Sequence, residues 1–256
     1  MERFINQIIC GDCLEVMPRI PDKSIDMILC DLPYGVTHNK KDIPIDLDKL
    51  WSQYKRIIKP SGNIILTSQF PYTLELILSN KEWFRYDLIW DKELTSGFLN
   101  ANRQPLRQHE HVLIFYESLQ TYNPQKTIGV KSHSKGKPKQ TQNRNYGKFG
   151  WTDADESGLK YPTSIIRFPK PHPSKAVHPT EKPVKLFEWL IRTYSNEGET
   201  ILDNCIGSGT TAVACINTKR NFIGIELEEK YYKIALERVA QIPRPFDSSK
   251  QKETDK

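Results

Sequence analysis

The chain has 256 residues and a formal net charge of +6, and 38% of its residues are hydrophobic. This length suits one large α/β domain with an inserted module, and the apolar fraction is sufficient for its core. No apolar run reaches the roughly 18 residues that a membrane span needs, and the N-terminal segment lacks the charged-then-apolar layout of a signal peptide. We therefore expect a cytoplasmic protein with no membrane partner.

The cysteines carry little functional signal. There are five of them (Cys10, Cys13, Cys30, Cys205 and Cys215), and an odd number without an export signal indicates free thiols in a reducing compartment. Cys10 and Cys13 have C-x-x-C spacing, but no second pair or nearby histidine pair completes a zinc site. We expect no metal, and we interpret this pair as two small residues at the end of a strand.

Strands and helices alternate along most of the chain. Short apolar runs predict strands at 7–10, 26–30, 63–67, 86–90, 111–116, 201–202 and 222–226. Three- and four-residue apolar spacing, with Pro and Gly at the ends, predicts helices at 14–17, 47–58, 72–78, 184–194, 211–218 and 230–240. We therefore expect a seven-stranded, mostly parallel sheet flanked by helices on both faces, with ligands at the carboxyl ends of its strands.

One segment interrupts this alternation. Residues 117–170 show little periodicity and are rich in Lys, Gly, Pro, Ser, Asn and Gln. We expect an insert there, between a first catalytic part at 1–116 and a second at 171–242, with a disordered tail at 243–256. From Ser118 to Thr152 the insert contains no acid. Aromatic residues are interleaved with its basic residues, a pattern that fits a surface for phosphates and bases and fits a solvated basic loop equally well. Its candidate DNA-binding residues are Lys126, Lys131, Lys135, Lys137, Lys139, Arg144 and Lys148.

The segment from Thr200 to Glu226 predicts a nucleotide site. It runs strand, Gly-rich turn, helix, strand and terminal acid. Gly207 and Gly209 let the backbone pass close to a ligand, and Glu226 can accept both hydroxyls of a ribose from its strand end. Taken alone, G-x-G-x-x-A fits NAD as well as S-adenosylmethionine. Only one helix and a tail follow Glu226, whereas a dinucleotide fold needs two βαβαβ halves, so the order favours S-adenosylmethionine.

The second functional segment is Asp31-Leu32-Pro33-Tyr34-Gly35, directly after the strand at 26–30. An exocyclic amine on a base is a poor nucleophile, because its lone pair is delocalised into the ring. The Asp31 carboxylate and the Leu32 carbonyl can accept its two hydrogens and favour a tetrahedral nitrogen. Pro33 would fix the turn, and Tyr34 would stack on the base. Its coincidence with a nucleotide motif on a compatible sheet favours this function over a simple structural turn.

With these motifs the chain resembles the amino-group DNA methyltransferases of the permuted β class. Matching segments follow in order: GDCLE (11–15), DLPYG (31–35), RQPLRQHEHVLIF (103–115), HPTEKPVKL (178–186) and GSGTT (207–211). The resemblance covers roughly 1–116 and 172–241. It implies a Rossmann-like methyltransferase fold in permuted order, with S-adenosylmethionine as cofactor and double-stranded DNA as partner.

The resemblance also implies roles for particular residues. The catalytic residues would be Asp31, Leu32, Pro33 and Tyr34. The cofactor-binding residues would be Asp12, Cys13, Thr180, Lys182, Pro183, Asp203, Cys205, Gly207, Ser208, Gly209, Thr210 and Glu226. The insert would be the target-recognition region. Two departures stand out: Leu32 replaces the usual second proline, and Asn204-Cys205 replaces a proline and a phenylalanine, which predicts a looser cofactor turn.

We therefore predict a site-specific methyltransferase that flips a base out of the duplex and methylates N6 of adenine. The resemblance favours adenine because the motif begins with Asp31 rather than Ser. The alternatives are a cytosine-N4 enzyme, an RNA or small-molecule methyltransferase, and an inactive DNA-binding protein of the same fold. A homodimer and a partner restriction nuclease are both compatible with this prediction, and the sequence decides neither.

Overall fold

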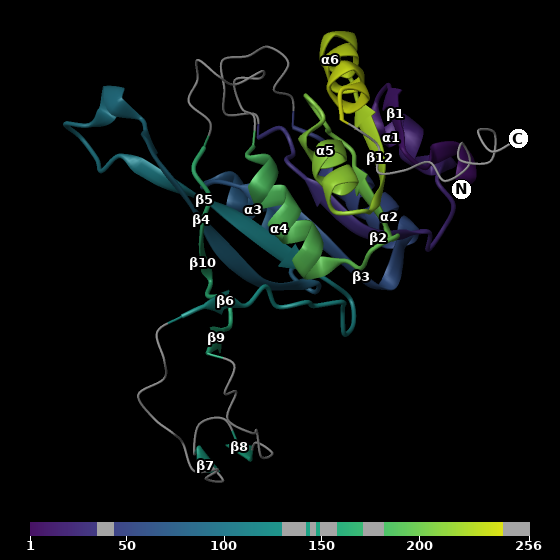
Figure 1. Ribbon diagram of the computed structural model, residues 1–256. Helices are drawn as coiled ribbons and strands as arrows, with labels where there is room; N and C mark the ends of the chain where they lie inside the picture. The colour runs from purple at the N-terminus through teal and green to yellow at the C-terminus, as the bar shows by residue number, and fades with distance from the viewer. Residues whose placement is uncertain (35–43, 130–141, 144–146, 149–157, 171–181, 243–256) are drawn as a thin grey trace, which may run out of the picture. The chain divides into compact units, whose positions relative to one another are not determined.

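The computed structural model describes residues 1–34, 44–129, 142–143, 147–148, 158–170 and 182–242 (Figure 1). The predicted tail and Thr180 lie outside these ranges. The chain forms two compact units, one of Met1–Asn123 with Ser164–Lys256 and the other of Pro124–Thr163. Within the described ranges, no helix is both long and apolar enough to cross a membrane.

The first unit is built on a mixed sheet with strand order β1-β12-β11-β2-β3-β5-β4-β10. In that order the strands are β1 (Gln7–Cys10), β12 (Asn221–Glu226), β11 (Thr200–Asp203), β2 (Ile25–Cys30), β3 (Ile58–Ser68), β5 (Arg107–Phe115), β4 (Phe84–Ser96) and β10 (Ile165–Arg167). Only β5 runs antiparallel to its neighbours in this described sheet. The predicted fold class, a mostly parallel sheet flanked by helices, is confirmed.

Helices cover both faces of this sheet (Figure 1). One face packs against α1 (Cys13–Val16), α2 (Leu47–Ile57) and α3 (Tyr72–Ser79), and the other against α4 (Val184–Tyr194), α5 (Thr210–Asn217) and α6 (Glu229–Ala240). In β2, Ile28 and Cys30 belong to the first core, and Met27 and Leu29 belong to the second. A strand buried on both faces explains the unbroken apolar run in the sequence.

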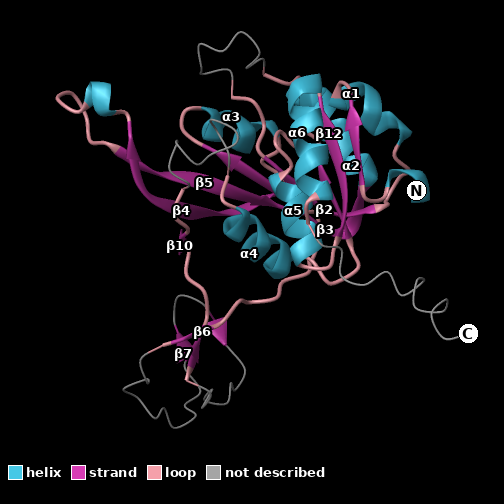
Figure 2. Ribbon diagram, turned by 45° about the horizontal axis from the view of Figure 1, so that its top comes forward, coloured by secondary structure: helices cyan, strands magenta, loops and turns pink. Residues whose placement is uncertain are grey.

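The described residues of this unit also form three short 3₁₀ helices: η1 (Glu2–Phe4), η2 (Met17–Arg19) and η3 (Phe98–Asn100). The last of them lies at the tip of a long β4–β5 hairpin, which extends beyond the rest of the sheet (Figure 2). The sequence predicted shorter strands at 86–90 and 111–116. The extensions were missed because most of their residues are polar, and so have no apolar pattern.

The predicted count of seven strands is one short, because the sheet has an eighth strand, β10, at its edge beyond β4. Its three residues fall inside the segment predicted as the insert, and they are too few to show a period. The remaining short strands pair within the second unit: β6 (Thr127–Ile128) with β9 (Leu159–Lys160), and β7 (Gln142–Asn143) with β8 (Gly147–Lys148). The predicted domain limits at 117 and 170 stay a prediction.

The strand order brings the two predicted functional turns together. After β2 the chain continues to β3 on one side, and after β11 it continues to β12 on the other, so the direction of winding reverses between β2 and β11. These two strands are parallel neighbours, with Ile28 opposite Leu202. The DLPYG turn after β2 and the Gly-rich turn after β11 therefore leave the same edge side by side, at the position where open α/β sheets bind ligands.

Candidate functional site

Asp31 is the first residue after β2, and three side chains bind its carboxylate. Tyr34 donates its hydroxyl to Oδ1 at 2.7 Å, and the Thr67 hydroxyl at the end of β3 donates to the same oxygen. Lys182 donates from Nζ to Oδ2 at 2.8 Å. The Asp31 side chain is 25% exposed. These partners fix the orientation of the carboxylate while leaving part of it open at the strand edge.

A line of alternating charges continues inward from Asp31. The Lys182 ammonium also lies 3.2 Å from Oε2 of Glu110 on β5, and Oε1 of Glu110 lies 3.2 Å from the Lys92 ammonium on β4. All three of these inner side chains are buried. We call Lys92, Glu110, Lys182 and Asp31 the charge chain. Its two positive and two negative groups balance, as burial requires.

The electrostatics of the charge chain favour the ionised forms. Burial alone would lower the pKa of the Lys182 ammonium, but Asp31 and Glu110 raise it well above its ordinary value. Burial alone would raise the pKa of the Glu110 carboxyl, but Lys182 and Lys92 hold it below its usual range. The ammonium that reaches Asp31 therefore stays charged at neutral pH.

Leu32, Pro33 and Tyr34 are arranged around Asp31. The Leu32 side chain is 2% exposed and packs in the core below the sheet edge, and Pro33 is half-buried. The Tyr34 ring lies 5.3 Å from the ring of Tyr72, tilted by 35°. Burial and the neighbouring Asp31 raise the pKa of the Tyr34 hydroxyl well above its ordinary value, so it remains a hydrogen-bond donor to Asp31.

The Asp203 carboxylate stabilises the first half of the Gly-rich turn by accepting two hydrogen bonds. Its Oδ1 accepts the backbone N–H of Cys205 at 3.1 Å, and its Oδ2 accepts the hydroxyl of Thr211. Burial raises the pKa of the Asp203 carboxyl to about 7. A carboxyl with this pKa ionises near neutral pH, and a cation bound beside it would favour the ionised form.

Glycine is required at Gly207 and Gly209 of this turn, and the space beside the backbone differs between the two positions. Gly207 has φ +53° and Gly209 has φ +86°, both in the left-handed region that favours glycine. A Cβ on Gly207 would meet nothing within 4 Å, so open space lies beside the backbone there. A Cβ on Gly209 would lie 3.1 Å from Cβ of Ala235 on α6. At Gly209 a side chain is therefore disfavoured by close packing against α6, and not by a ligand.

Arg238 of α6 stabilises the second half of this turn by hydrogen bonds. Its guanidinium donates to the backbone carbonyl of Ser208 at 3.3 Å, to the Ser208 hydroxyl at 3.2 Å and to the Thr210 hydroxyl at 3.3 Å. Ser208 and Thr210 are both buried. The turn thus enters α5 with its backbone direction set by a neighbouring helix.

Glu226 ends β12 beside this turn and is 8% exposed. Its Oε2 accepts the N–H of Gly207 at 2.8 Å, and its Oε1 accepts the N–H of Glu228 at 2.9 Å. A carboxylate has about four acceptor sites, so capacity is left for ligand hydroxyls. Burial raises the pKa of the Glu226 carboxyl. The acid is therefore held in place with spare acceptor capacity at the strand edge.

Asp12 and Cys13 lie one strand further along the same edge, because Cys10 of β1 pairs with Glu226 of β12. The Asp12 carboxylate caps α1 by accepting the N–H of Leu14 at 2.7 Å. A hydrogen bond with Cys205 and burial raise the pKa of the Cys13 thiol. Cys10 is exposed while Cys13 is buried, so the two residues of the C-x-x-C spacing lie in different environments.

The departure at Asn204 has a structural counterpart. Asn204 is 2% exposed, and its side-chain oxygen accepts the hydroxyl of the buried Tyr54 from α2. Its amide also lies 3.5 Å from the sulfur of Cys205. This position, where the resembled family has proline, is thus fixed by a side-chain hydrogen bond. The looser turn stays a prediction.

The structure places the remaining predicted residues as follows. Pro183 is buried and precedes α4 as its N-cap, next to Lys182. The ammonium of Lys126 lies over the ring of Tyr161, 4.3 Å from its centroid, within the second unit. The predicted positions outside the described residues or side chains are Lys131, Lys135, Lys137, Lys139, Arg144, Lys148 and Thr180.

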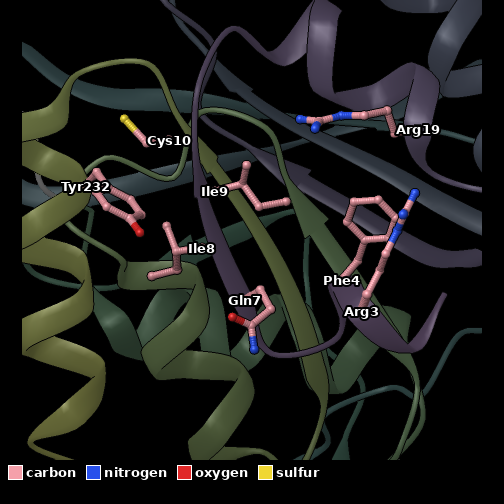
Figure 3. Close-up of a pocket in the computed structure, with 8 residues that line it drawn as sticks. All are labelled: Arg3, Phe4, Gln7, Ile8, Ile9, Cys10, Arg19 and Tyr232. Atoms are coloured by element: carbon pink, nitrogen blue, oxygen red, sulfur yellow. The ribbon is translucent and has the colours of Figure 1, made fainter.

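A separate cavity of about 530 Å³ lies along β1 (Figure 3). It is lined by Arg3, Phe4, Gln7, Ile8, Ile9, Cys10, Arg19 and Tyr232. None of the predicted catalytic or cofactor residues is among them, so this cavity is distinct from the candidate site.

The sequence reasoning did not single out Thr67, Lys92 or Glu110. Thr67 lies near the end of β3, and Lys92 and Glu110 belong to the exposed-looking extension of β4 and β5. A sequence signal did exist for Glu110, because it lies inside the family-like segment 103–115. Its pairing with Lys182 requires knowledge of the fold.

Comparison with known proteins agrees with this geometry. The family described as DNA methylase matches residues 25–237. The type II methyltransferase M.HinfI of Haemophilus influenzae is 28% identical, over 95% of this chain and 71% of its own length. The DNA adenine methyltransferase YhdJ of Escherichia coli K12 is 27% identical, over 93% of this chain and 84% of its own length.

Solved structures share the fold. The complex of M1.HpyAVI with SAM has a TM-score of 0.62 and 22% identity, covering 91% of this chain and 98% of its own. The cytosine-N4-specific PvuII DNA methyltransferase has a TM-score of 0.65 and 15% identity, covering 94% of this chain and 87% of its own. At these identities the likeness concerns the fold alone.

Proposed function

Because the chain belongs to the DNA methylase family, we propose that it transfers the methyl group of S-adenosylmethionine to N6 of adenine in DNA. The observation that carries this proposal is the position of Asp31. Its partly open carboxylate lies at the reversal of the sheet, beside the Gly-rich turn. An acceptor for an amine and a candidate nucleotide site thus share one edge.

The residues of the Gly-rich turn fit the proposed cofactor. Open space lies beside Gly207, and Glu226 keeps acceptor capacity for the ribose hydroxyls. The Asp203 carboxylate, with its pKa of about 7, is suited to the ammonium of the methionine end. When bound, S-adenosylmethionine supplies a methyl group on a positively charged sulfur. Asp12 and Lys182 are also among the residues that we propose to line the S-adenosylmethionine site.

The catalytic role that we propose for Asp31 is to accept a hydrogen bond from the target amine. The Leu32 carbonyl accepts a hydrogen bond from the second N–H of the amine. Together the two acceptors localise the nitrogen lone pair and direct it toward the methyl donor. In the structure Lys182 occupies Oδ2 of Asp31. When the carboxylate turns to an amine, Lys182 still has Glu110 at 3.2 Å, so its charge stays paired. The charge chain thus lets Asp31 change partners without leaving a buried charge alone.

Adenine is the base that we propose, since the motif begins with Asp31 and a relative of this chain is named as an adenine methyltransferase. Cytosine-N4 transfer is the second candidate, because a cytosine-N4-specific enzyme shares the fold. Either amine is buried in a duplex, so the base must be flipped out at a cost of a few kcal/mol.

We further propose that the insert, with predicted limits 117–170, contacts the DNA backbone. Its acid-free stretch from 118 to 152 supports this, since lysines and arginines without nearby acids release counterions when they meet phosphates. Recognition of a particular site would come from base-edge contacts made by the same segment.

Sequencing with detection of modified bases tests the proposal. The enzyme is expressed in a host without DNA methylation, and the Asp31→Ala variant serves as the control. We expect N6-methyladenine at one recurring site with the parent and none with the variant. N4-methylcytosine at a recurring site would favour the cytosine-N4 alternative over adenine. Unmodified DNA from a host that contains the folded parent protein would contradict both.

A further inference from the structure

The β4–β5 hairpin presents an apolar tip to solvent. Every residue from Glu93 to His109 is exposed, and the hairpin extends away from the sheet in both views (Figures 1 and 2). At its tip Phe98 is 80% exposed and Leu99 is 99% exposed. Two adjacent large apolar side chains with so little cover in their own unit indicate a surface that meets a partner.

The tip has a defined backbone. Gly97 has φ +86°, and η3 follows with the N–H of Asn100 donating to the carbonyl of Gly97 at 2.9 Å. The N–H of Arg103 then donates to the carbonyl of Asn100 at 2.8 Å. Below the tip, the Ser96 hydroxyl donates to the carbonyl of Arg107 at 3.1 Å. Phe98 and Leu99 are therefore held outward by a folded turn.

The charge of the hairpin favours a polyanion. Between Leu94 and Gln108 there is no acid, and the basic residues are Arg103 and Arg107. The Arg107 guanidinium also donates to the side chain of Gln69, next to the end of β3. An apolar tip followed by two arginines matches nucleic acid, which offers stacked bases beside phosphates.

The hairpin rises from the edge that contains Asp31. Because β4 is parallel to β3 and β2 through its pairing with β5, its carboxyl end lies with theirs. Its base also contains Lys92 and Glu110, which connect through Lys182 to Asp31. DNA bound at Asp31 would therefore meet the hairpin on the same side of the sheet.

From these observations we propose that the hairpin is a DNA wedge. Phe98 and Leu99 insert between bases next to the target, and Arg103 and Arg107 hold the flanking phosphates. The inference rests on the proposed DNA methyl transfer and adds the means of opening the duplex. Apolar wedges of Phe and Leu separate stacked bases in other DNA-binding proteins, and flipping a base requires such unstacking.

A second copy of the chain is the competing partner for this tip. Stable protein interfaces bury about 800 Å² on each partner. Two side chains at the end of a narrow hairpin are a small part of such an area, and the flanking arginines would face the same arginines if two tips met. The proposal therefore commits to double-stranded DNA.

The test compares the double variant Phe98→Ala, Leu99→Ala with Leu119→Ala as the matched control. Leu119 is 90% exposed and follows the carboxyl end of β5, at the opposite edge of the sheet. All three side chains lie in solvent, so the variants should fold like the parent. Two duplexes contain the site found by sequencing, one with the target base paired and one with it mismatched. Both kcat/KM for methyl transfer and equilibrium binding of the duplexes are measured.

We expect the double variant to lower kcat/KM on the paired duplex by at least about tenfold, and by less than about threefold on the mismatched duplex, where the base is already unpaired. Its affinity for the paired duplex should fall as well, while Leu119→Ala matches the parent. Parent-like values on the paired duplex, or equal losses on both duplexes, would overturn the wedge. So would a loss that light scattering traces to a dimer becoming a monomer. A parent that binds but does not methylate either duplex would instead count against the proposed function, and the binding comparison would still decide the wedge.

Discussion

Replacing Lys182 with methionine should expose how much the protein depends on the charge chain. Methionine has nearly the length of lysine but no charge, so Asp31 and Glu110 lose their shared cation. Removing one partner of a buried ion pair costs about 3–5 kcal/mol, because the remaining charge is left without compensation. Asp31 is 25% exposed and regains some water, whereas Glu110 is 9% exposed and loses one of its two ion-pair partners among the described residues, keeping Lys92.

Urea unfolding of Lys182→Met and the parent measures this loss. With a slope of about 2–3 kcal/mol per molar, 3–5 kcal/mol moves the midpoint down by roughly 1–2 M. The pKa of Glu110 is held below its usual value in the folded state, so its stabilisation is present above the unfolded value near 4.5 and is lost as pH falls through the folded pKa. The difference between variant and parent should therefore be full at pH 7 and shrink below about pH 4.5.

Lys185→Met, in the first turn of α4, is the matched control. Lys185 is 80% exposed, and without it the buried Glu188 keeps its hydrogen bond from Asn217 and its ion pair with Arg192, so this change should cost much less stability. Methyl transfer by Lys182→Met should also fall, since Asp31 loses one of its three positioning contacts. A variant as stable as Lys185→Met, with no change in this difference between pH 4 and pH 7, would refute the buried charge chain.

Three further predictions concern ligands. Glu226→Ala should weaken S-adenosylmethionine binding at least about tenfold in calorimetry, because ribose acceptors worth about 1.5–3 kcal/mol each are lost; an unchanged dissociation constant would remove Glu226 from the site. If the ionised Asp203 holds the cofactor's ammonium, affinity should fall by up to about tenfold per pH unit below its pKa of about 7, and Asp203→Asn should abolish this dependence. A pH-independent parent would exclude that role. Replacing Lys135, Lys137 and Lys139 together with Ala should flatten the plot of log K against log salt by roughly 2.7, at about 0.9 per phosphate contact. A slope equal to the parent's would mean that these lysines do not contact DNA.

Local signals in the sequence predicted much of the fold. The runs that became β2 and β12 are short and apolar, and the turns after β2 and β11 have Pro or Gly where the chain must bend. Such features depend only on neighbouring residues. The edge that Asp31 and Glu226 share was predictable too, since both follow strands that the alternation makes parallel.

The contacts that surround Asp31 were not predictable in the same way. Glu110 and Lys182 are far apart in sequence, and no local pattern indicates their pairing, which depends on how the sheet folds. The hydroxyl of Tyr54 was equally hidden, because the residue fits the apolar stripe of α2 and its bond to Asn204 spans most of the chain. Polar contacts between distant elements leave no period in the sequence.

Incubation of the purified enzyme with methyl-labelled S-adenosylmethionine and duplex DNA tests the central proposal most directly. The DNA is then digested to nucleosides, and the labelled species is identified by mass and retention. We expect label in N6-methyladenine with the parent, and a loss of several orders of magnitude with Asp31→Ala while the variant still binds the cofactor. Label in neither base, or transfer by Asp31→Ala within a few-fold of the parent, would contradict the assignment of Asp31 as the residue that orients the target amine.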